Sequence, residues 1–184
     1  MFTLTGADSD DDSDKRKNYL QMSNAKKRLT QSGLNKDERV ELESRLRLSD
    51  EEFNMMQERE EYILTIADDG MGQLCSAYEY RVTSRGGKGI GNMDLAKNAK
   101  IVGTYRITPS EDDIILVTDG GQIIRMPTDK IRVISRRSKG VRLFNINDDQ
   151  KVVSASRVSD SSSDDDDQDS VENDTTDENN APEA

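Results

Sequence analysis

The sequence contains no histidine and no tryptophan, and it has a single cysteine, Cys75. Without histidine, the chain lacks the side chain that most often serves as a general base near neutral pH and most often binds a metal ion. A single cysteine excludes an intrachain disulfide. The chain also has no apolar run of the roughly 18 residues that a membrane span needs, and its first residues lack the pattern of a secretion signal. These absences predict a cytoplasmic protein with no membrane contact.

Charge is distributed unevenly along the chain, whose net charge is −11. Residues 159–184 contain eleven acidic residues and no basic ones, and residues 1–61 have a net charge of −4. Residues 62–158 have a net charge of +4. The total charge would argue against a nucleic-acid partner, but the basic middle segment permits one.

Residues 1–61 are predicted to contain a strand end, a linker and a helical segment. Residues 1–5 resemble the end of a strand, residues 6–17 form an Asp/Ser-rich linker, and residues 18–61 favour two short, charged surface helices. Asn35 with Glu38, and Ser49 with Glu52, have the spacing of capping boxes at helix starts. Apolar residues are too sparse here for an independent core, and partial disorder remains an alternative.

The middle of the chain repeats itself. With an offset of 51 residues, positions 63–108 align without a gap with positions 114–159, and 12 of the 46 pairs are identical. Val, Ile and Thr are common in both copies and turn residues are frequent, as strands require. A four-stranded unit of this length is typical of a propeller-like blade. We therefore predict two blades, at about 62–110 and 111–158, which are too few to close a ring.

The second copy shows the plan of a blade most clearly. Residues 114–118 and 122–126 flank the turn Asp119-Gly120-Gly121, whose glycines favour a hairpin. Residues 130–134 are predicted to form the next strand, and 141–146 and 152–157 complete the unit. Beyond it, residues 159–184 contain almost nothing apolar, which predicts a disordered acidic tail.

Two basic loops carry the functional prediction. The first basic loop (84–89) reads SRGGKG, and the second basic loop (135–140) reads SRRSKG. Their glycines allow close approach of the backbone, and their Arg and Lys side chains supply the charge that holds phosphate oxygens without reading bases. Either loop alone could be a tight turn with solvated charges, but their recurrence predicts a basic track across both blades. The predicted DNA-binding residues are Arg81, Arg85, Gly86, Gly87, Lys88, Gly89, Arg132, Arg136, Arg137, Lys139, Gly140 and Arg142.

Other candidate sites are weaker. The segment Gly86-Gly87-Lys88-Gly89 is not a nucleotide-binding P-loop, because Ile90 follows it and no helix is predicted there. Asp164–Asp167 is a solvated charge run rather than a metal site. The tyrosines are predicted to pack in or near the core, and Cys75 to be a buried thiol. The sequence therefore predicts no catalytic residue and no metal site.

At the basic loops the sequence resembles the C-terminal domain of bacterial DNA gyrase A. Residues 61–70 (EYILTIADDG) with 76–90 look like a late blade, and 114–121 with 135–141 look like the last blade. The acidic tail is typical of this family, and residues 6–61 resemble a variable insertion of some members. Arg85, Gly86, Gly87, Lys88 and Gly89 match part of the family's Gln-Arg-Arg-Gly-Gly-Lys-Gly box, in which Thr83 and Ser84 replace the first two residues.

The resemblance implies a β-pinwheel that wraps double-stranded DNA around a basic rim during ATP-dependent negative supercoiling by a type II topoisomerase. The implied partners are DNA, the remainder of gyrase A and the gyrase B protein. Mg²⁺ and ATP would be used by other gyrase domains, so no cofactor is expected in this chain. The catalytic tyrosine of the family lies in a domain that this sequence does not contain.

Two alternatives remain open. The blades could be a scaffold for a protein-interaction module whose acidic tail contacts a basic partner, or they could belong to the equivalent part of topoisomerase IV. The Gly-Gly-Lys-Gly segment favours gyrase over topoisomerase IV. We also expect the tail to compete with DNA for the basic track, because its carboxylates imitate phosphates.

Overall fold

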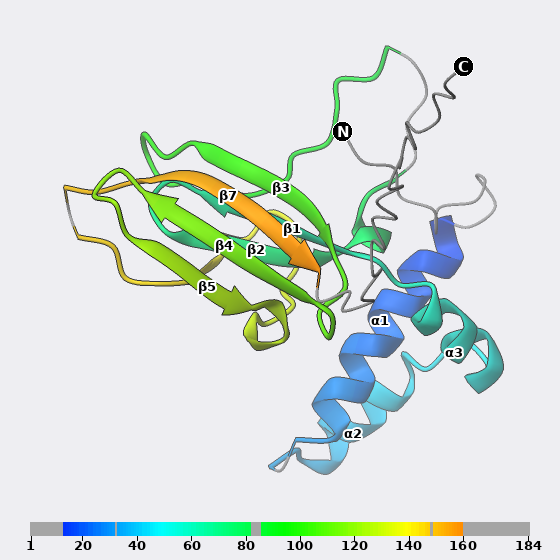
Figure 1. Cartoon of the computed structure of the whole chain (residues 1–184). Coiled ribbons are helices and arrows are strands. Elements are labelled where there is room, and N and C mark those ends of the chain that lie inside the picture. The colour runs from blue at the N-terminus through cyan, green and yellow to red at the C-terminus, as the bar shows by residue number, and fades with distance from the viewer. Residues whose placement is uncertain (1–12, 32, 82–85, 148, 160–184) are drawn as a thin grey trace, which may run out of the picture.

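A computed structural model describes residues 13–31, 33–81, 86–147 and 149–159. Three helices come first: α1 (Ser13–Leu29), α2 (Lys36–Glu43) and α3 (Asp50–Glu58). Two sheets follow, and the helices lie beside one end of the sheet pair rather than across a sheet face (Figure 1). The predicted strand at residues 1–5 and most of the predicted tail lie outside the described residues.

Both predicted capping boxes are confirmed. The Glu38 amide donates to Asn35 Oδ1 (2.8 Å) and the Asn35 amide donates to Glu38 Oε2 (3.0 Å) at the start of α2. Ser49 and Glu52 make the same reciprocal pair at the start of α3. These bonds satisfy amide groups that have no partner within the first helical turn.

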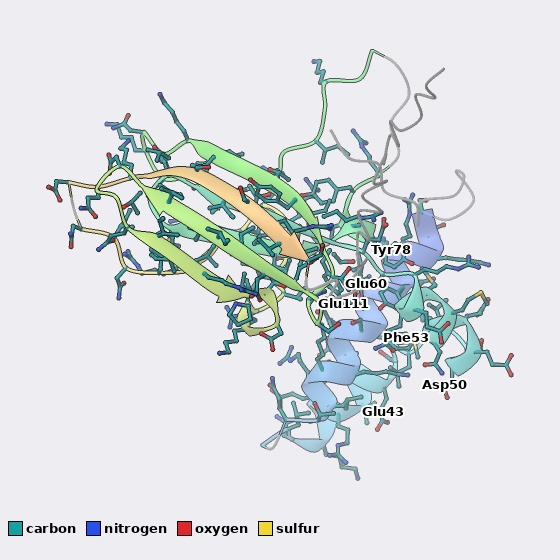
Figure 2. The ribbon with its side chains drawn as sticks, in the orientation of Figure 1. Glu43, Asp50, Phe53, Glu60, Tyr78 and Glu111 are labelled. Atoms are coloured by element: carbon teal, nitrogen blue, oxygen red, sulfur yellow. The ribbon has the colours of Figure 1, made fainter. Side chains whose placement is uncertain are left out.

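Two predictions for the helical segment are wrong. The stretch predicted as a linker reaches only residue 12 at most, because Ser13–Lys17 already belong to α1. The prediction of two short helices is also wrong, because the described residues form three helices and α1 has 17 residues. A small apolar cluster joins α1 to α3, in which the Tyr19 ring stacks on Phe53 with centroids 5.0 Å apart. Tyr78, from the sheet part of the chain, contacts Tyr19 edge-on at 5.2 Å. Figure 2 shows Phe53, Glu60 and Tyr78 where the helices meet the sheets.

Within the described residues, seven strands make up the two sheets. They are β1 (Tyr62–Ala67), β2 (Met71–Ser76), β3 (Ile101–Ile107), β4 (Asp112–Thr118), β5 (Ile123–Pro127), β6 (Val141–Arg142) and β7 (Val152–Ser159). The first sheet has the strand order β3-β1-β2-β6 and the second has the order β5-β4-β7. The hairpin of β1 and β2 turns at Asp68–Gly70, and that of β4 and β5 turns at Asp119–Gly121, as predicted. Gly70 and Gly121 both have a positive φ near 80°, which these turns require.

One strand is exchanged between the repeats. β6 belongs to the second repeat in sequence, but it pairs with β2 of the first, with Gly72 opposite Val141. The fourth strand of the first sheet is therefore supplied by the second repeat. Within the described residues the second sheet has three strands, so the outer edge of β5 has no partner there. The predicted boundary near residue 110 separates the two repeats in the sequence. In the structure, however, β6 lies after this boundary and pairs with a strand that comes before it.

The strand predicted at 130–134 is wrong. Residues Thr128–Lys130 form the short 3-10 turn η3, just as Ala77–Glu79 form η2 in the first repeat. Only one isolated parallel bridge, between Leu74 and Val133, follows η3. The strand predicted at 141–146 is also shorter than expected, because only Val141–Arg142 are paired. Both segments run along the outer edge of β2, where the Ile134 amide donates to the Leu74 carbonyl (2.8 Å) and the Leu143 amide donates to the Gly70 carbonyl (3.0 Å).

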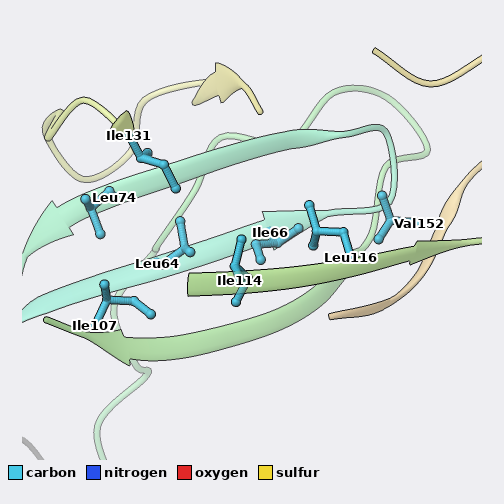
Figure 3. Packing of buried hydrophobic residues seen from close by; sticks show 8 residues of the cluster. All are labelled: Leu64, Ile66, Leu74, Ile107, Ile114, Leu116, Ile131 and Val152. Atoms are coloured by element: carbon cyan, nitrogen blue, oxygen red, sulfur yellow. The ribbon is translucent and has the colours of Figure 1, made fainter. Parts of the chain in front are cut away.

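The main core lies between the two sheets. Leu64 and Ile66 from β1 face Ile114 and Leu116 from β4, and all four are fully buried (Figure 3). Burial alternates along β4, as in a strand with one face against a core. Residues from both repeats therefore form one apolar layer, which holds the blades together.

The internal repeat also recurs in polar contacts. Asp68 Oδ1 accepts a hydrogen bond from the Lys100 amide (2.8 Å), and Asp119 Oδ1 accepts one from the Lys151 amide (2.9 Å). Arg106 pairs with Glu61 (3.0 Å), and its repeat counterpart Arg157 lies 3.7 Å from Asp112. These contacts give a structural reason for several of the pairs that the two repeats share.

The side chain of Asp68 joins the two repeats through an ion pair, and this ion pair predicts that the stability of the fold depends on acid pH. Its Oδ2 lies 3.1 Å from Lys151 Nζ. Burial alone would raise the pKa of Asp68, but the Lys100 amide and the Lys151 ammonium together lower it below its ordinary value. A carboxylate with a lowered pKa stabilises the fold above its unfolded-state pKa of about 4, and this contribution disappears as the pH falls below that value.

We expect Asp68→Asn to lower the free energy of unfolding by about 1–2 kcal/mol at neutral pH. The difference from the wild type should shrink as the pH falls below about 4, and urea unfolding monitored by circular dichroism measures it. Asp119→Asn is the matched control, because Asp119 accepts the equivalent backbone hydrogen bond. Equal effects of the two substitutions at every pH would contradict a specific role of the Asp68–Lys151 pair.

Candidate nucleic-acid interface

The second basic loop lies directly against the segment that follows the first basic loop. The Arg137 amide donates to the Asn92 carbonyl (2.7 Å), and the Asp94 amide donates to the Ser138 carbonyl (2.9 Å). A Cβ added at Gly140 would lie 2.7 Å from the Met93 side chain. The second basic loop therefore contacts residues that follow the first basic loop, and the continuous track across both loops stays a prediction.

Positive φ angles shape both loops. Gly86 and Gly89 in the first loop and Gly140 in the second have φ near +80°, and Arg137 has φ +66°. Glycine adopts this conformation without the steric cost that a side chain brings. No atom of the described residues lies within 4 Å of a Cβ placed at Gly86 or Gly89, so both glycines have open surroundings there. Such backbone can approach a phosphate closely and present its N–H groups.

Most of the predicted cationic side chains are exposed. Exposed residues can exchange bound counterions for DNA phosphates, which is the main source of non-specific affinity. The first basic loop lies partly outside the described residues, and Arg85 lies there, so its position is not assigned. The exposed predicted cations are Arg81, Lys88, Arg132, Arg137, Lys139 and Arg142.

Arg136 has a different place from its neighbours. Its Nε donates to the Glu79 carbonyl (3.2 Å), a terminal nitrogen donates to the Gly91 carbonyl, and its guanidinium lies 5.6 Å from the centre of the Tyr80 ring. Its amide also donates to the Glu79 carboxylate (2.6 Å). Burial raises the pKa of Glu79, and Arg136 partly offsets this. Arg136 therefore ties the second basic loop to the first repeat, and its guanidinium is already occupied by backbone acceptors.

A small network of side-chain hydrogen bonds lies next to Arg136 and holds Tyr80 and Asn92 in place. Tyr80 donates to Asn92 Oδ1 (2.5 Å), and the Asn92 amide group donates to Thr65 Oγ1 (2.7 Å). Cys75 is fully buried beside the Tyr80 hydroxyl, and burial raises the pKa of its thiol. The predicted buried thiol is confirmed, and the tyrosines are buried or half-buried as predicted.

Sequence reasoning missed Lys97. This exposed lysine lines a groove of about 440 Å³ together with Lys139 and Arg142. Asp69 and Asp94 also line the groove, so the local charge is mixed but positive. Lys97 has no basic counterpart in the second repeat, where Asp148 stands at the equivalent position. The search for repeated charges therefore could not find it.

Within the described ranges, no group of three or more Cys, Asp or Glu side chains could hold a metal ion. The described helices also include none long and apolar enough to cross a membrane. What the geometry offers is a surface: two adjacent loops with open backbone amides, surrounded by exposed Arg and Lys side chains.

The fold and this surface define a class of protein, namely a repeat of propeller-like β blades with exposed basic side chains on its loops. A family model described as the DNA gyrase C-terminal domain, beta-propeller, matches residues 61–108 and 112–159. The chain belongs to this family. The predicted all-β, pinwheel-like fold class and the resemblance to gyrase A are confirmed.

Curated relatives agree with this assignment. The DNA gyrase A protein of Granulibacter bethesdensis is 44% identical over 109 residues, which are 58% of this chain and 12% of that protein. Its counterpart in Rickettsia bellii is 40% identical over 115 residues, covering 62% of this chain and 13% of that protein. The chain thus spans about an eighth of the length of these relatives.

A solved structure supports the fold independently. The C-terminal domain of DNA topoisomerase IV superimposes with a TM-score of 0.50 at 18% identity, covering 54% of this chain and 30% of that one. At this level of identity the likeness concerns the fold alone.

Proposed function

We propose that residues 62–159 bind double-stranded DNA through its phosphates and bend it around the blades, as the DNA-wrapping part of DNA gyrase. The observation that supports this most strongly is the backbone contact of the second basic loop, through Arg137 and Ser138, with residues 92–94. These residues follow the first basic loop within five positions, so the contact favours one basic surface that includes exposed cations of both repeats. Exposed cationic side chains and open backbone amides suit phosphates, whereas base reading needs side chains held rigidly in a groove.

The outer edge of β5 has no strand partner in the described part of the chain, which supports association with further blades of gyrase A. Ile123, at the start of this strand, is 73% exposed. The equivalent edge in the first repeat, that of β2, is covered by β6 from the next repeat. An exposed strand edge readily accepts another strand. A strand from another blade of the remainder of gyrase A fits this edge by the same exchange.

In this proposal the chain has no cofactor of its own and acts in the cytoplasm. The remainder of gyrase A and the gyrase B protein carry out strand passage, using Mg²⁺ and ATP. This chain supplies the geometry of the bound DNA and none of the chemistry.

Binding to two unrelated duplexes of equal length tests the proposal. We expect dissociation constants, measured by fluorescence anisotropy, to agree within about threefold, because phosphate contacts carry no sequence information. Energy transfer between dyes at the two duplex ends should rise on binding if the DNA bends. A preference above about 100-fold for one sequence, or binding without any rise in energy transfer, would contradict non-specific wrapping.

A further inference from the structure

Arg16 is an unusual residue of α1. It is only 5% exposed, and it lies on the helix face that also buries Tyr19 and Met22. Its Nη1 atom is buried without a hydrogen-bond partner, and no carboxylate pairs with Arg16 in the described part of the chain. A guanidinium cannot lose its proton at accessible pH, so Arg16 is a buried positive charge. Such charges are normally paired, because their removal from water is costly.

Arg16 lines an open pocket of about 400 Å³ between α1 and the first repeat. Lys17 and Arg81 line the same pocket, and so does Ser13, the first described residue of α1. Glu79 is the one acidic residue of the lining, and its carboxylate already accepts the Arg136 amide. The pocket therefore combines three cations, one of which, Arg16, has a buried Nη1 atom without a hydrogen-bond partner among the described residues.

The position of the pocket indicates which anion it suits. Arg81 leads into the first basic loop, and Ser135, also in the lining, begins the second. Arginine holds phosphate oxygens through two parallel N–H donors. We propose that this pocket binds a phosphate group, supplied in the DNA complex by the DNA backbone. The choice of DNA as the source of the phosphate rests on the proposed function. A phosphate bound in this pocket would extend the basic track onto α1, which lies outside the segments matched by the family model.

Arg16→Gln tests the pocket, with Lys27→Gln as the matched control. Lys27 is an exposed residue of the same helix that does not line the pocket, so its loss changes the net charge equally. The probe is inorganic phosphate, compared with chloride and acetate at equal ionic strength. We expect phosphate to raise the midpoint of thermal unfolding of the full chain by about 3 °C. Arg16→Gln should abolish this rise, and Lys27→Gln should retain it.

The unfolding midpoint in chloride distinguishes a binding role from a structural one. An unpaired buried charge does not stabilise the free protein, so Arg16→Gln should unfold at the same temperature as the wild type or higher. A clear loss of stability in chloride, together with an unchanged phosphate response, would overturn the proposal. An equal rise in acetate would also overturn it, because the pocket would then accept any carboxylate.

A second arm identifies the source of the phosphate. We expect Arg16→Gln to weaken binding of a DNA duplex about fivefold, while Lys27→Gln changes it less than about twofold. An unchanged DNA affinity with a lost phosphate response would overturn the DNA backbone as the source. If the wild type bound no DNA at all, the proposed function would be wrong. The unfolding midpoints in inorganic phosphate would still test whether the pocket binds phosphate.

Discussion

Gly140→Ala is expected to lower the free energy of unfolding by about 3 kcal/mol. Gly140 has φ +82°, a conformation that costs an L-residue roughly 1–2 kcal/mol. An added Cβ would also lie 2.7 Å from the Gly72 carbonyl oxygen, which is backbone and cannot move away cheaply. Forced overpacking of this kind costs about 1–3 kcal/mol. Because Gly140 immediately precedes β6, we expect the clash to displace the exchanged strand from β2.

Gly89→Ala is the matched control for this prediction. Gly89 is the equivalent residue of the first repeat and has φ +78°, but no atom lies within 4 Å of a Cβ placed there. It should therefore lose only about 1 kcal/mol, from backbone strain alone. Chemical denaturation of both variants measures the difference. Equal losses would show that the close approach of β6 to β2 contributes nothing to stability.

The second large effect is expected on DNA affinity. Replacing Lys88, Arg137, Lys139 and Arg142 together by glutamine should raise the dissociation constant for duplex DNA roughly 100-fold at about 0.1 M salt. All four side chains are exposed, and no ion pair involves them in the described ranges. Their loss therefore removes counterion release without removing a structural contact. Fluorescence anisotropy with one labelled duplex measures the change.

A control with the same change of net charge separates a local effect from a general one. Lys36, Arg39, Arg45 and Arg47 are exposed residues in and after α2, at the end of the molecule away from the sheets (Figure 1). Replacing these four by glutamine should raise the dissociation constant by less than about threefold. If both quadruple variants lost affinity equally, the basic loops would have no special part in binding. Unchanged unfolding midpoints confirm that both variants are folded.

The sequence predicted the parts of the fold that local chemistry determines. The two capping boxes and the two glycine hairpins depend on residues within a few positions of one another, and all four are present. The exchange of β6 could not be predicted this way. Val141 and Arg142 form too short a strand to show an alternating pattern, and their partner Gly72 lies about 70 residues away. Residues 130–134 have the composition of a strand but do not form one. Their apolar residue Ile131 is buried although it belongs to no β-sheet.

The helical segment was underestimated for a related reason. Its sequence is mostly charged, and α1 buries only Arg16, Tyr19, Met22 and Ala25. The small core becomes visible only when α1 packs against Phe53 from α3 and Tyr78 from the first repeat. A pattern search within one helix cannot detect apolar residues contributed by three separate segments.

The predicted DNA-binding role of the candidate interface stays a prediction, and the structure describes only the surroundings of its residues. Repetition of charges indicated both loops, and the exposure of Lys88, Arg137, Lys139 and Arg142 agrees with that prediction. Repetition could not distinguish Arg136, whose guanidinium is bound internally, from its exposed neighbours. Arg16 escaped notice because it lies outside the repeats and its burial depends on tertiary contacts.

The salt dependence of duplex binding tests the central claim most directly. If the basic loops hold DNA by its phosphates, the logarithm of the association constant should fall linearly with the logarithm of the salt concentration. The six exposed cations on or beside the track predict a slope of about −5 for the wild type. The slope should approach about −2 when Lys88, Arg137, Lys139 and Arg142 are replaced. A slope near zero for the wild type, or the same slope for both proteins, would contradict the account.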